Sequence, residues 1–401
     1  MRSKPEQDKR KILIYKWKAY SYADICEALS NLGYEFIIVE QDLDNYDEDR
    51  EFEEKLEGIV RKEKCGMIFS VNYFALVTTV CVKLDIPYVV WTCDSPLISM
   101  YHKNVFCSCN YFFTFDKTNY IEFKGMGVEH IWHLPLAVNT GRIDYLLLNC
   151  EDLFLYENDI AFVGSLYERN SYDRLRTVLP EYLKGYFDAA VWAQQCVSGG
   201  NILEEMLTVG ILEELEQYFK LEKSEDSFSD LGLIFSTTVL GFKTAAEQRR
   251  RMLLELSRKY GVTVYSNSDT SDLFRVRYGG SLDYWSEMPK VFAASKINLN
   301  FTIPNIKSGL PLRVFDVLGS GGFLMTNFQA ELPRYFKNRE DLVCFESAEE
   351  LVELCGYYLA HDEERRQIAA SGYEKVKKHH TYEKRIRMMM ETVRNDAGDA
   401  Q

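Results

Sequence analysis

The chain has 401 residues and a formal net charge of −14. This charge argues against a nucleic-acid-binding protein, because neutralising many phosphates requires a basic face. A single nucleotide can still be held by a few local cations and backbone amides. Hydrophobic residues make up 46% and charged residues 27% of the chain, a globular composition, and the length predicts two or three domains.

Nothing in the sequence indicates a membrane protein or a secreted one. No apolar run approaches the roughly 20 residues that span a bilayer. The N-terminal MRSKPEQDKRK lacks the apolar stretch of a signal peptide. The ten cysteines include no CxxC pair, which indicates reduced thiols, and the six histidines form no HxxxH or HExxH pattern. We therefore expect a cytoplasmic protein with no metal site and no transmembrane segment; peripheral membrane association stays open.

Short apolar runs alternate with helical stretches in the N-terminal part of the chain. Strands are predicted at residues 11–15, 34–40, 65–71, 86–92, 111–116 and 131–136. Helices are predicted at 22–32 and 73–84, and residues 41–57 are expected to form a solvated loop and helix. This alternation is typical of βαβ units that build a parallel sheet.

A second series of the same kind begins at DIAFVGSLYERNSYD (159–173), where a strand runs into a glycine turn. A helix-rich stretch follows, in which Thr244 and Glu247 form a capping box that predicts a helix over 245–259. Further strands are predicted within 262–269, 296–302, 322–327 and 341–347, and closing helices at 348–360, 362–378 and 381–395.

Two Rossmann-like parallel-sheet domains facing across a cleft account for both series. We place the first domain at residues 1–155 and the second at 156–380. The last helix, within 381–401, is expected to pack back on the first domain. Ligands of such domains bind at the carboxyl ends of the strands.

The stretch SGLPLRVFDVLGSGGFLMTN carries the clearest chemistry. Arg313 and Asp316 share one face of a predicted helix over 311–319, and Lys307 precedes it. One interpretation is a nucleotide site that includes Gly309: Asp316 accepts hydrogen bonds from a ribose, and the two cations neutralise a diphosphate near the helix N-terminus. The alternative is a surface ion pair worth a few tenths of a kcal/mol beside a glycine-rich turn.

Several runs resemble a known family. NFTIPNIKSGLPLRVFDVLGSGGFLMTNFQAELPRYF resembles the C-terminal domain of GT-B glycosyltransferases of the spore-maturation type, and ESAEELVELCGYYLAHDEERRQIAASGYEKVKKHHTYEKRI is similar to its closing helices. IPYVVWTCDSPLISMY, FFTFDKTNYIEF and HLPLAVNTGRID resemble the preceding N-terminal domain. The resemblance is weakest over residues 170–260. It implies the GT-B fold, a nucleotide-sugar donor held by the second domain and an acceptor held by the first.

The resemblance assigns roles residue by residue. Asp316 matches the acid, usually Glu, that holds the donor ribose in the family. Many retaining relatives carry another Glu eight positions earlier, where this chain has Ser308, which leaves the sugar contact and the stereochemistry open. Gly164 matches the glycine of the phosphate-facing loop. Ser165 replaces the basic residue that commonly follows it, so Arg169 is expected to supply that charge.

Asp94 and His102 are the candidate bases of the first domain. Asp94, in TCDSP, follows a predicted strand and could deprotonate an acceptor hydroxyl. The alternative is an Asx-turn, since Asp-Ser-Pro is common turn chemistry. His102 lies eight residues further on, and its alternative is a structural histidine.

Three residues of the second domain are candidates for the nucleobase pocket. Tyr265 and Ser266 close a predicted strand, and Tyr265 either stacks on the base or belongs to the core. Tyr284 either lines the same pocket or packs as a hydrophobic staple. Residues 249–251, three arginines, are interpreted as a solvated helix face.

Together these features predict a glycosyltransferase that moves a sugar from a nucleoside diphosphate sugar, such as a UDP-sugar, to a hydroxyl of a glycan or protein. No cofactor beyond the donor substrate and no metal is expected. One alternative is a non-catalytic GT-B-like module that binds a nucleotide sugar or glycan, which Ser308 keeps open. The other is a sugar-nucleotide epimerase, which uses a similar cleft.

Overall fold

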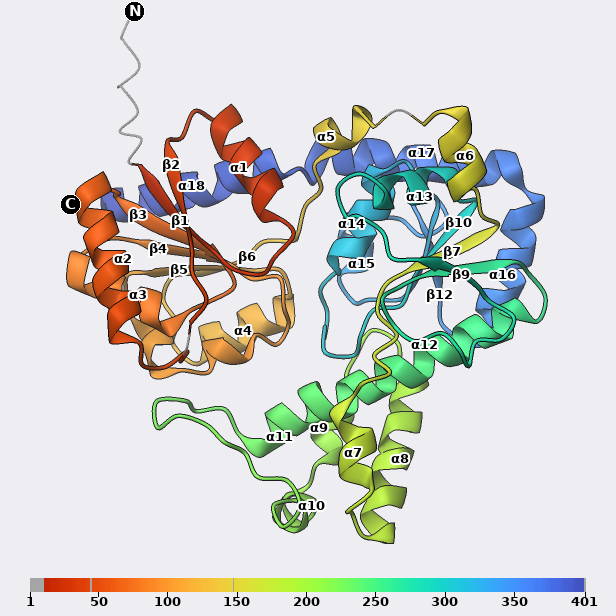
Figure 1. The fold of residues 1–401 in the computed structure, drawn as a ribbon, viewed down its shortest axis with the longest axis horizontal. Coiled ribbons are helices and arrows are strands. Elements are labelled where there is room, and N and C mark those ends of the chain that lie inside the picture. Colours follow the sequence, from red (N-terminus) through yellow and green to blue (C-terminus); the bar gives the residue numbers. More distant parts are fainter. Residues whose placement is uncertain (1–10, 44, 147, 400–401) are drawn as a thin grey trace, which may run out of the picture.

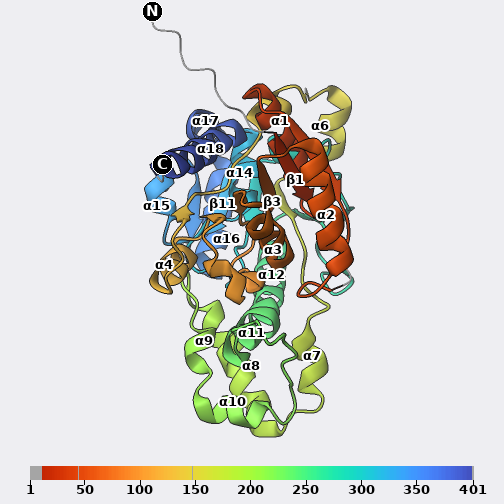
Figure 2. The ribbon, with the colours of Figure 1, turned by 90° about the vertical axis from the view of Figure 1, so that its left-hand side faces the viewer.

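The computed structural model describes residues 11–43, 45–146 and 148–399. The N-terminal segment that bears on the signal-peptide expectation lies, apart from Lys11, outside these residues. Two α/β domains lie side by side, and a helical insertion projects below the second (Figure 1). In Figure 2, where the first domain faces the viewer, the helical insertion lies below both domains. Within the described residues, every helix is too short or too polar to cross a bilayer.

The first domain contains a six-stranded parallel sheet in the order β2-β1-β3-β4-β5-β6. Its strands are β1 Ile12–Lys16, β2 Phe36–Glu40, β3 Met67–Val71, β4 Tyr88–Trp91, β5 Asn110–Thr114 and β6 Ile131–His133. Its helices are α1 Tyr22–Asn31, α2 Arg50–Glu63, α3 Ala75–Leu84 and α4 Lys117–Gly125. The chain reverses direction of travel across the sheet between β1 and β3, and such a switch point opens a crevice for ligands.

The second domain contains a parallel sheet in the order β12-β11-β10-β7-β8-β9. Its strands are β7 Ile160–Val163, β8 Val262–Tyr265, β9 Arg277–Gly280, β10 Ile297–Asn300, β11 Leu324–Asn327 and β12 Val343–Phe345. Its helices include α13 Met288–Ala294, α14 Leu312–Gly319, α15 Leu332–Tyr335, α16 Ala348–Ala360 and α17 Asp362–His379. The switch point lies between β7 and β10. Strand β9 was not predicted, because the edge sequence RYGG is mostly exposed and has no apolar pattern.

Two short helices, α5 Thr140–Asp144 and α6 Cys150–Tyr156, connect the domains. The last helix, α18 Tyr382–Asp399, runs from α17 to the first domain (Figure 1). Its buried residues Ile386 and Met389 belong to the same core as Tyr22 of α1. The Tyr382 ring lies edge-on to Trp91 at 5.7 Å.

The helical insertion has a core of its own, which includes Phe187 and Leu203. Its helices are α7 Ser171–Arg176, α8 Glu181–Gln195, α9 Leu203–Met206, α10 Val209–Leu215 and α11 Leu231–Ile234. A π-helical turn, Phe235–Gly241, continues α11 into α12 Phe242–Ser257. The Asn305 amide donates to the Thr237 carbonyl of this turn (3.0 Å), and a Cβ at Gly241 would collide with the Asn305 oxygen.

The predicted capping box is wrong, because Thr244 lies buried inside a continuous helix. Its hydroxyl donates to the Leu240 carbonyl (2.9 Å), one turn earlier. A threonine that bonds the preceding turn fits a helix interior as well as a cap. The real N-cap is Asp230, whose carboxylate accepts from the Leu233 amide (2.7 Å).

Candidate functional site

A cavity of about 420 Å³ opens at the carboxyl ends of β7 and β8. It is shaped mainly by the loops after these strands, by the segment after β9 and by α14. Six of the residues predicted to bind the donor line it: Gly164, Arg169, Tyr265, Ser266, Tyr284 and Arg313. The structure thus brings together side chains that lie up to 149 positions apart in the sequence (313 − 164).

Asp316 lies directly behind this cavity. Its carboxylate accepts hydrogen bonds from the Tyr284 hydroxyl (3.0 Å) and from Arg313 Nη1 (3.2 Å). Because Asp316 is only 6% exposed, the alternative of a surface ion pair is wrong. Burial raises the pKa of Asp316 to about 6, although Arg313 and the Tyr284 hydrogen bond act in the opposite direction. The carboxylate is therefore ionised at neutral pH and is held by two groups that line the cavity.

Tyr265 and Ser266 both line the cavity, and their contacts bear on the two alternatives left open for Tyr265. The Tyr265 ring is buried against Gly279, and its hydroxyl accepts from Asn158 (3.2 Å). These contacts favour the alternative of a core residue over base stacking. Ser266 is also buried, and its backbone amide donates to Gly280 (2.9 Å), which joins the loop to β9.

Two aromatic residues of the cavity were missed. Tyr20, from the loop after β1, stacks on Tyr284 at 5.1 Å and covers the cavity from the first domain. Tyr167 has a positive φ of 52°, stacks on Phe242 at 5.2 Å and lies on the boundary with a second cavity. Tyr167 follows the predicted phosphate-facing loop and was within reach of sequence reasoning. Tyr20 was not, because its contact depends on how the domains dock.

Lys307, Ser308 and Gly309 do not line this cavity; they contact the first domain. The backbone amides of Lys307 and Ser308 donate to Asp116 Oδ2 (2.8 and 3.2 Å). The Lys307 ammonium pairs with Glu204 of the insertion (2.9 Å). A Cβ at Gly309 would lie 2.9 Å from a backbone oxygen of the first domain. The predicted phosphate role of Lys307 and Gly309 is therefore not supported by their positions.

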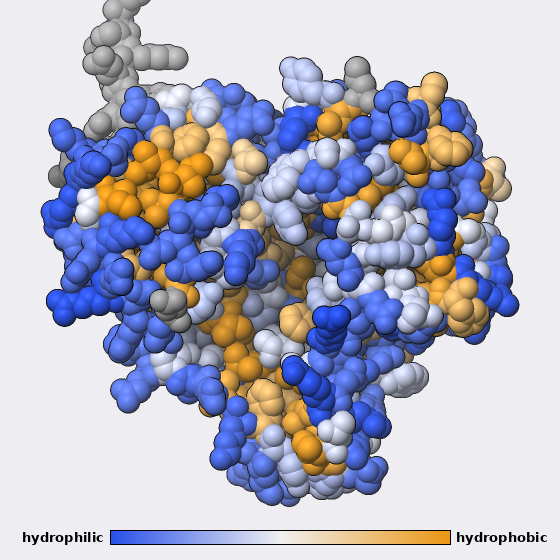
Figure 3. Space-filling model, in the orientation of Figure 1, coloured by the Kyte–Doolittle hydropathy of each residue, from blue (hydrophilic) through white to orange (hydrophobic). Residues whose placement is uncertain are grey.

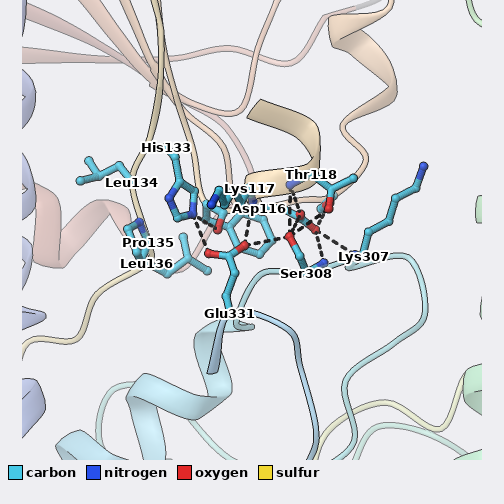
Figure 4. Close-up of polar contacts among 12 residues, drawn as sticks. Asp116, Lys117, Thr118, His133, Leu134, Pro135, Leu136, Lys307, Ser308 and Glu331 are labelled. Carbon is cyan, nitrogen blue, oxygen red and sulfur yellow. Dashed lines mark hydrogen bonds and ion pairs between the residues drawn. The ribbon is translucent and has the colours of Figure 1, made fainter. Parts of the chain in front are cut away.

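Ser308 is the centre of a buried polar cluster between the domains (Figure 4). Its hydroxyl lies 2.6 Å from Asp116 Oδ1 and 2.8 Å from Glu331 Oε1. Glu331 also accepts from the Lys117 amide (2.8 Å) and pairs with His133 (2.7 Å). Burial raises the pKa of Glu331, but these hydrogen bonds outweigh it and leave the pKa below its usual value. Ser308 thus joins the two domains.

A second cavity, of about 520 Å³, lies at the switch point of the first sheet. Trp17 follows β1, and Asn72 and Phe74 follow β3; the opposite wall includes Phe242 and Ile303 from the other side of the cleft. Apolar residues gather in the hollow where both domains and the insertion meet (Figure 3). Tyr167 lines both cavities, so the two are neighbours.

The two candidate bases of the first domain lie apart. Asp94 is exposed, lines the second cavity and accepts from Asn72 Nδ2 (2.7 Å). His102 lines a different cavity, against the insertion, and is 6% exposed. Its Nδ1 accepts from the Asn104 amide (3.1 Å), and Nε2 lies 3.9 Å from Asp226. Burial lowers the pKa of His102 in spite of that carboxylate. These contacts favour a structural role for His102.

In the part of the chain that the structure describes, no group of three or more His, Cys, Asp or Glu side chains is arranged to hold a metal ion.

Comparison with known proteins agrees with this architecture. Residues 248–391 match a protein-family model described as glycosyl transferase-like. No curated protein matches the chain in sequence. Solved structures that are similar include a glycosyltransferase from Rickettsia africae ESF-5, with a TM-score of 0.59 and 10% identity over 97% of this chain and 100% of that one.

Two further solved structures show the same arrangement. Sucrose-phosphate synthase from Thermosynechococcus elongatus has a TM-score of 0.55 and 12% identity over 97% of this chain and all of its own. Anabaena HepE, solved in complex with UDP-glucose, has a TM-score of 0.54 and 9% identity over 96% of this chain and all of its own. With its two parallel six-stranded sheets, the chain has the GT-B fold, as predicted. Its second domain and closing helices contain a glycosyl transferase-like region.

Proposed function

We propose that the protein is a glycosyltransferase that moves a sugar from a nucleoside diphosphate sugar to a hydroxyl acceptor. The observation that carries the proposal is the cavity after β7 and β8. It combines the glycine loop at Gly164, the guanidinium groups of Arg169 and Arg313, and the buried carboxylate of Asp316 behind them. Cations and backbone amides suit a diphosphate, and an ionised carboxylate suits ribose hydroxyls.

In this proposal the two neighbouring cavities hold the two substrates. The acceptor lies in the aromatic cavity of the first domain, beside Asp94. Its hydroxyl oxygen forms a bond to the anomeric carbon of the sugar, and Asp94 takes the hydroxyl proton. The bond between that carbon and the phosphate oxygen breaks, and the nucleoside diphosphate leaves with the electron pair, stabilised by the cations.

The finer assignments are also proposals. UDP is the first nucleotide to test, since HepE was solved with UDP and UDP-glucose. The acceptor is a glycan or a protein, in the manner of the spore-maturation type. We propose that no metal ion or cofactor takes part. All ten cysteines lie in the described residues and are unpaired, which supports a reducing, cytoplasmic location.

Asp94→Asn tests the division of labour between the cavities. We expect the rate of sugar transfer, or of donor hydrolysis by water, to fall by about 100-fold, since general-base assistance contributes roughly 10²–10⁴-fold. The dissociation constant of the nucleoside diphosphate should change less than about twofold. Calorimetry with UDP, GDP, CDP and dTDP identifies the nucleotide, and the rate is measured with and without EDTA.

The matched control is Asp85→Asn, at an exposed helix end with a φ of 53° that asparagine tolerates. It should leave both quantities unchanged. Equal rates for Asp94→Asn and wild type would remove Asp94 from the mechanism. Loss of the rate on adding EDTA would contradict the metal-free reaction.

Ser308 favours one second candidate, a binding module without turnover. The position of the family's second acid is enclosed between Asp116 and Glu331 and does not reach the first cavity. Tight donor binding with neither transfer nor hydrolysis would support the module. Conversion of one donor sugar into its epimer would instead support the epimerase alternative.

A further inference from the structure

Arg249 and Arg250 are both partly buried on α12 but have different partners. The sequence predicts a solvated face for residues 249–251, whereas all three arginines are only partly exposed, and Arg250 pairs with Asp272. Arg249 is half-buried on α12 beneath the loop after β7. Its Nη1 donates to the Ser165 carbonyl (2.6 Å) and its Nη2 to the Phe301 carbonyl (2.7 Å). The expectation of a solvated face is therefore wrong for Arg249.

These two carbonyls belong to the two sides of the switch point. Ser165 follows β7 and Phe301 follows β10, which are adjacent strands of the second sheet. Ligands of doubly wound sheets bind in the crevice between such strand ends. The Arg249 guanidinium thus spans the crevice itself. A Cβ at Gly164 would lie 3.9 Å from Nη1, so the glycine of the cavity loop lies directly against this cation.

Arg249 has no counter-ion among the described residues. No carboxylate lies within ion-pair distance, and its buried Nε has no hydrogen-bond partner. Its charged neighbour is Arg313, which repels it, and the Tyr167 ring lies 4.9 Å from the guanidinium carbon. Burial lowers the pKa of Arg249, although a guanidinium stays protonated. A half-buried cation that faces only neutral acceptors is left for an anion to neutralise.

The guanidinium does not itself line the first cavity; it lies behind the loop that does. Gly164 and Ser165 line this cavity, and Arg249 bonds the Ser165 carbonyl from the other side of the loop. We propose that Arg249, as a positioning residue beneath the loop at residues 164–167, holds the Ser165 carbonyl and adds positive charge to the phosphate end of the cavity, next to the cavity-lining Arg169 and Arg313. This inference rests on the proposed function.

The test compares a nucleoside diphosphate with its nucleoside, for example UDP with uridine, by calorimetry. Arg249→Gln removes the charge but keeps a donor for the carbonyls. We expect UDP affinity to fall by about 10- to 100-fold, because the phosphates lose one positive charge a few ångströms away, while uridine affinity changes less than about twofold. Arg249→Lys keeps the charge and should weaken UDP binding by less than about fivefold. Arg258→Met, at an exposed arginine near the end of the same helix, should change neither affinity.

Unchanged UDP affinity in Arg249→Gln would overturn the inference. So would an equal loss for UDP and uridine, because that result indicates a structural role for the side chain. If Arg249→Gln does not fold, Arg249→Lys decides: a loss of UDP affinity beyond about fivefold, or any matching loss for uridine, overturns the inference. Wild-type protein that binds no nucleoside diphosphate contradicts the proposed function itself, and this is seen before any variant is made.

Discussion

The two sheets share one architecture but differ in the residues that follow their strands. After β1 and β3 of the first sheet come Trp17, Asn72 and Phe74, which are uncharged. After β7 and β10 of the second come Gly164 and a crevice spanned by the Arg249 guanidinium. Both places are switch points of parallel sheets, where ligands of this fold class bind.

The backbone places a crevice at both sites, so the difference between them lies in the residues of the loops. The second domain offers cations and a glycine loop, which suit phosphates. The first offers aromatic walls with a few polar groups, which suit a ring-bearing or partly apolar molecule. A fold alone therefore does not assign function; the chemistry of the residues that follow the strands does.

The largest expected effect comes from Ser308→Glu, which acts on the buried polar cluster between the two domains. It places a third carboxylate beside Asp116 and Glu331 in a buried site. We expect a loss of about 3–5 kcal/mol in the free energy of unfolding, since an unpaired buried charge costs this much. Urea unfolding measures it. Ser165→Glu, at an exposed serine, should cost less than about 0.5 kcal/mol. Equal stability of both variants would contradict the cluster.

Asp316→Asn tests the charged site of the second domain through the pH dependence of the free energy of unfolding. Burial raises the pKa of Asp316 from 3.8 to about 6. Its contribution therefore favours the folded state below about pH 4 and is lost as the pH rises through 6. The variant should be more stable than wild type at pH 8, by roughly 1–3 kcal/mol, and lose this advantage at pH 4. Urea unfolding at both values checks this. A difference that does not depend on pH would contradict the raised pKa.

Trp17→Ala should have the smallest effect and sharpens the comparison. If the cavity of the first domain does not hold the nucleotide, the UDP affinity of Trp17→Ala should differ from that of wild type by less than about twofold. Tyr284→Ala removes an aromatic ring from the cavity of the second domain and should weaken UDP binding several-fold, since it also removes a hydrogen bond to Asp316. Calorimetry compares the two variants. Equal losses of UDP affinity in the two variants would mean that the cavities of both domains hold the nucleotide.

Much of the fold was predictable because parallel strands buried on both faces read as continuous apolar runs. This signal located eleven of the twelve strands in the described residues, all but the exposed edge strand β9. The capping-box prediction at Thr244 failed because the same pattern also fits a helix interior. Local spacing placed Arg313 and Asp316 on one face of α14, and the structure confirms that pairing.

The sequence by itself determined which side chains share a helix face and where strands end, because these depend on neighbours within a few residues. Only the tertiary structure decided the partners of Ser308, which lie on segments up to 192 positions away. It also decided that Arg249 bonds the Ser165 carbonyl under the loop while Arg250 pairs with Asp272. Both outcomes depend on how whole elements dock, since domain and helix packing set contacts that local spacing does not encode.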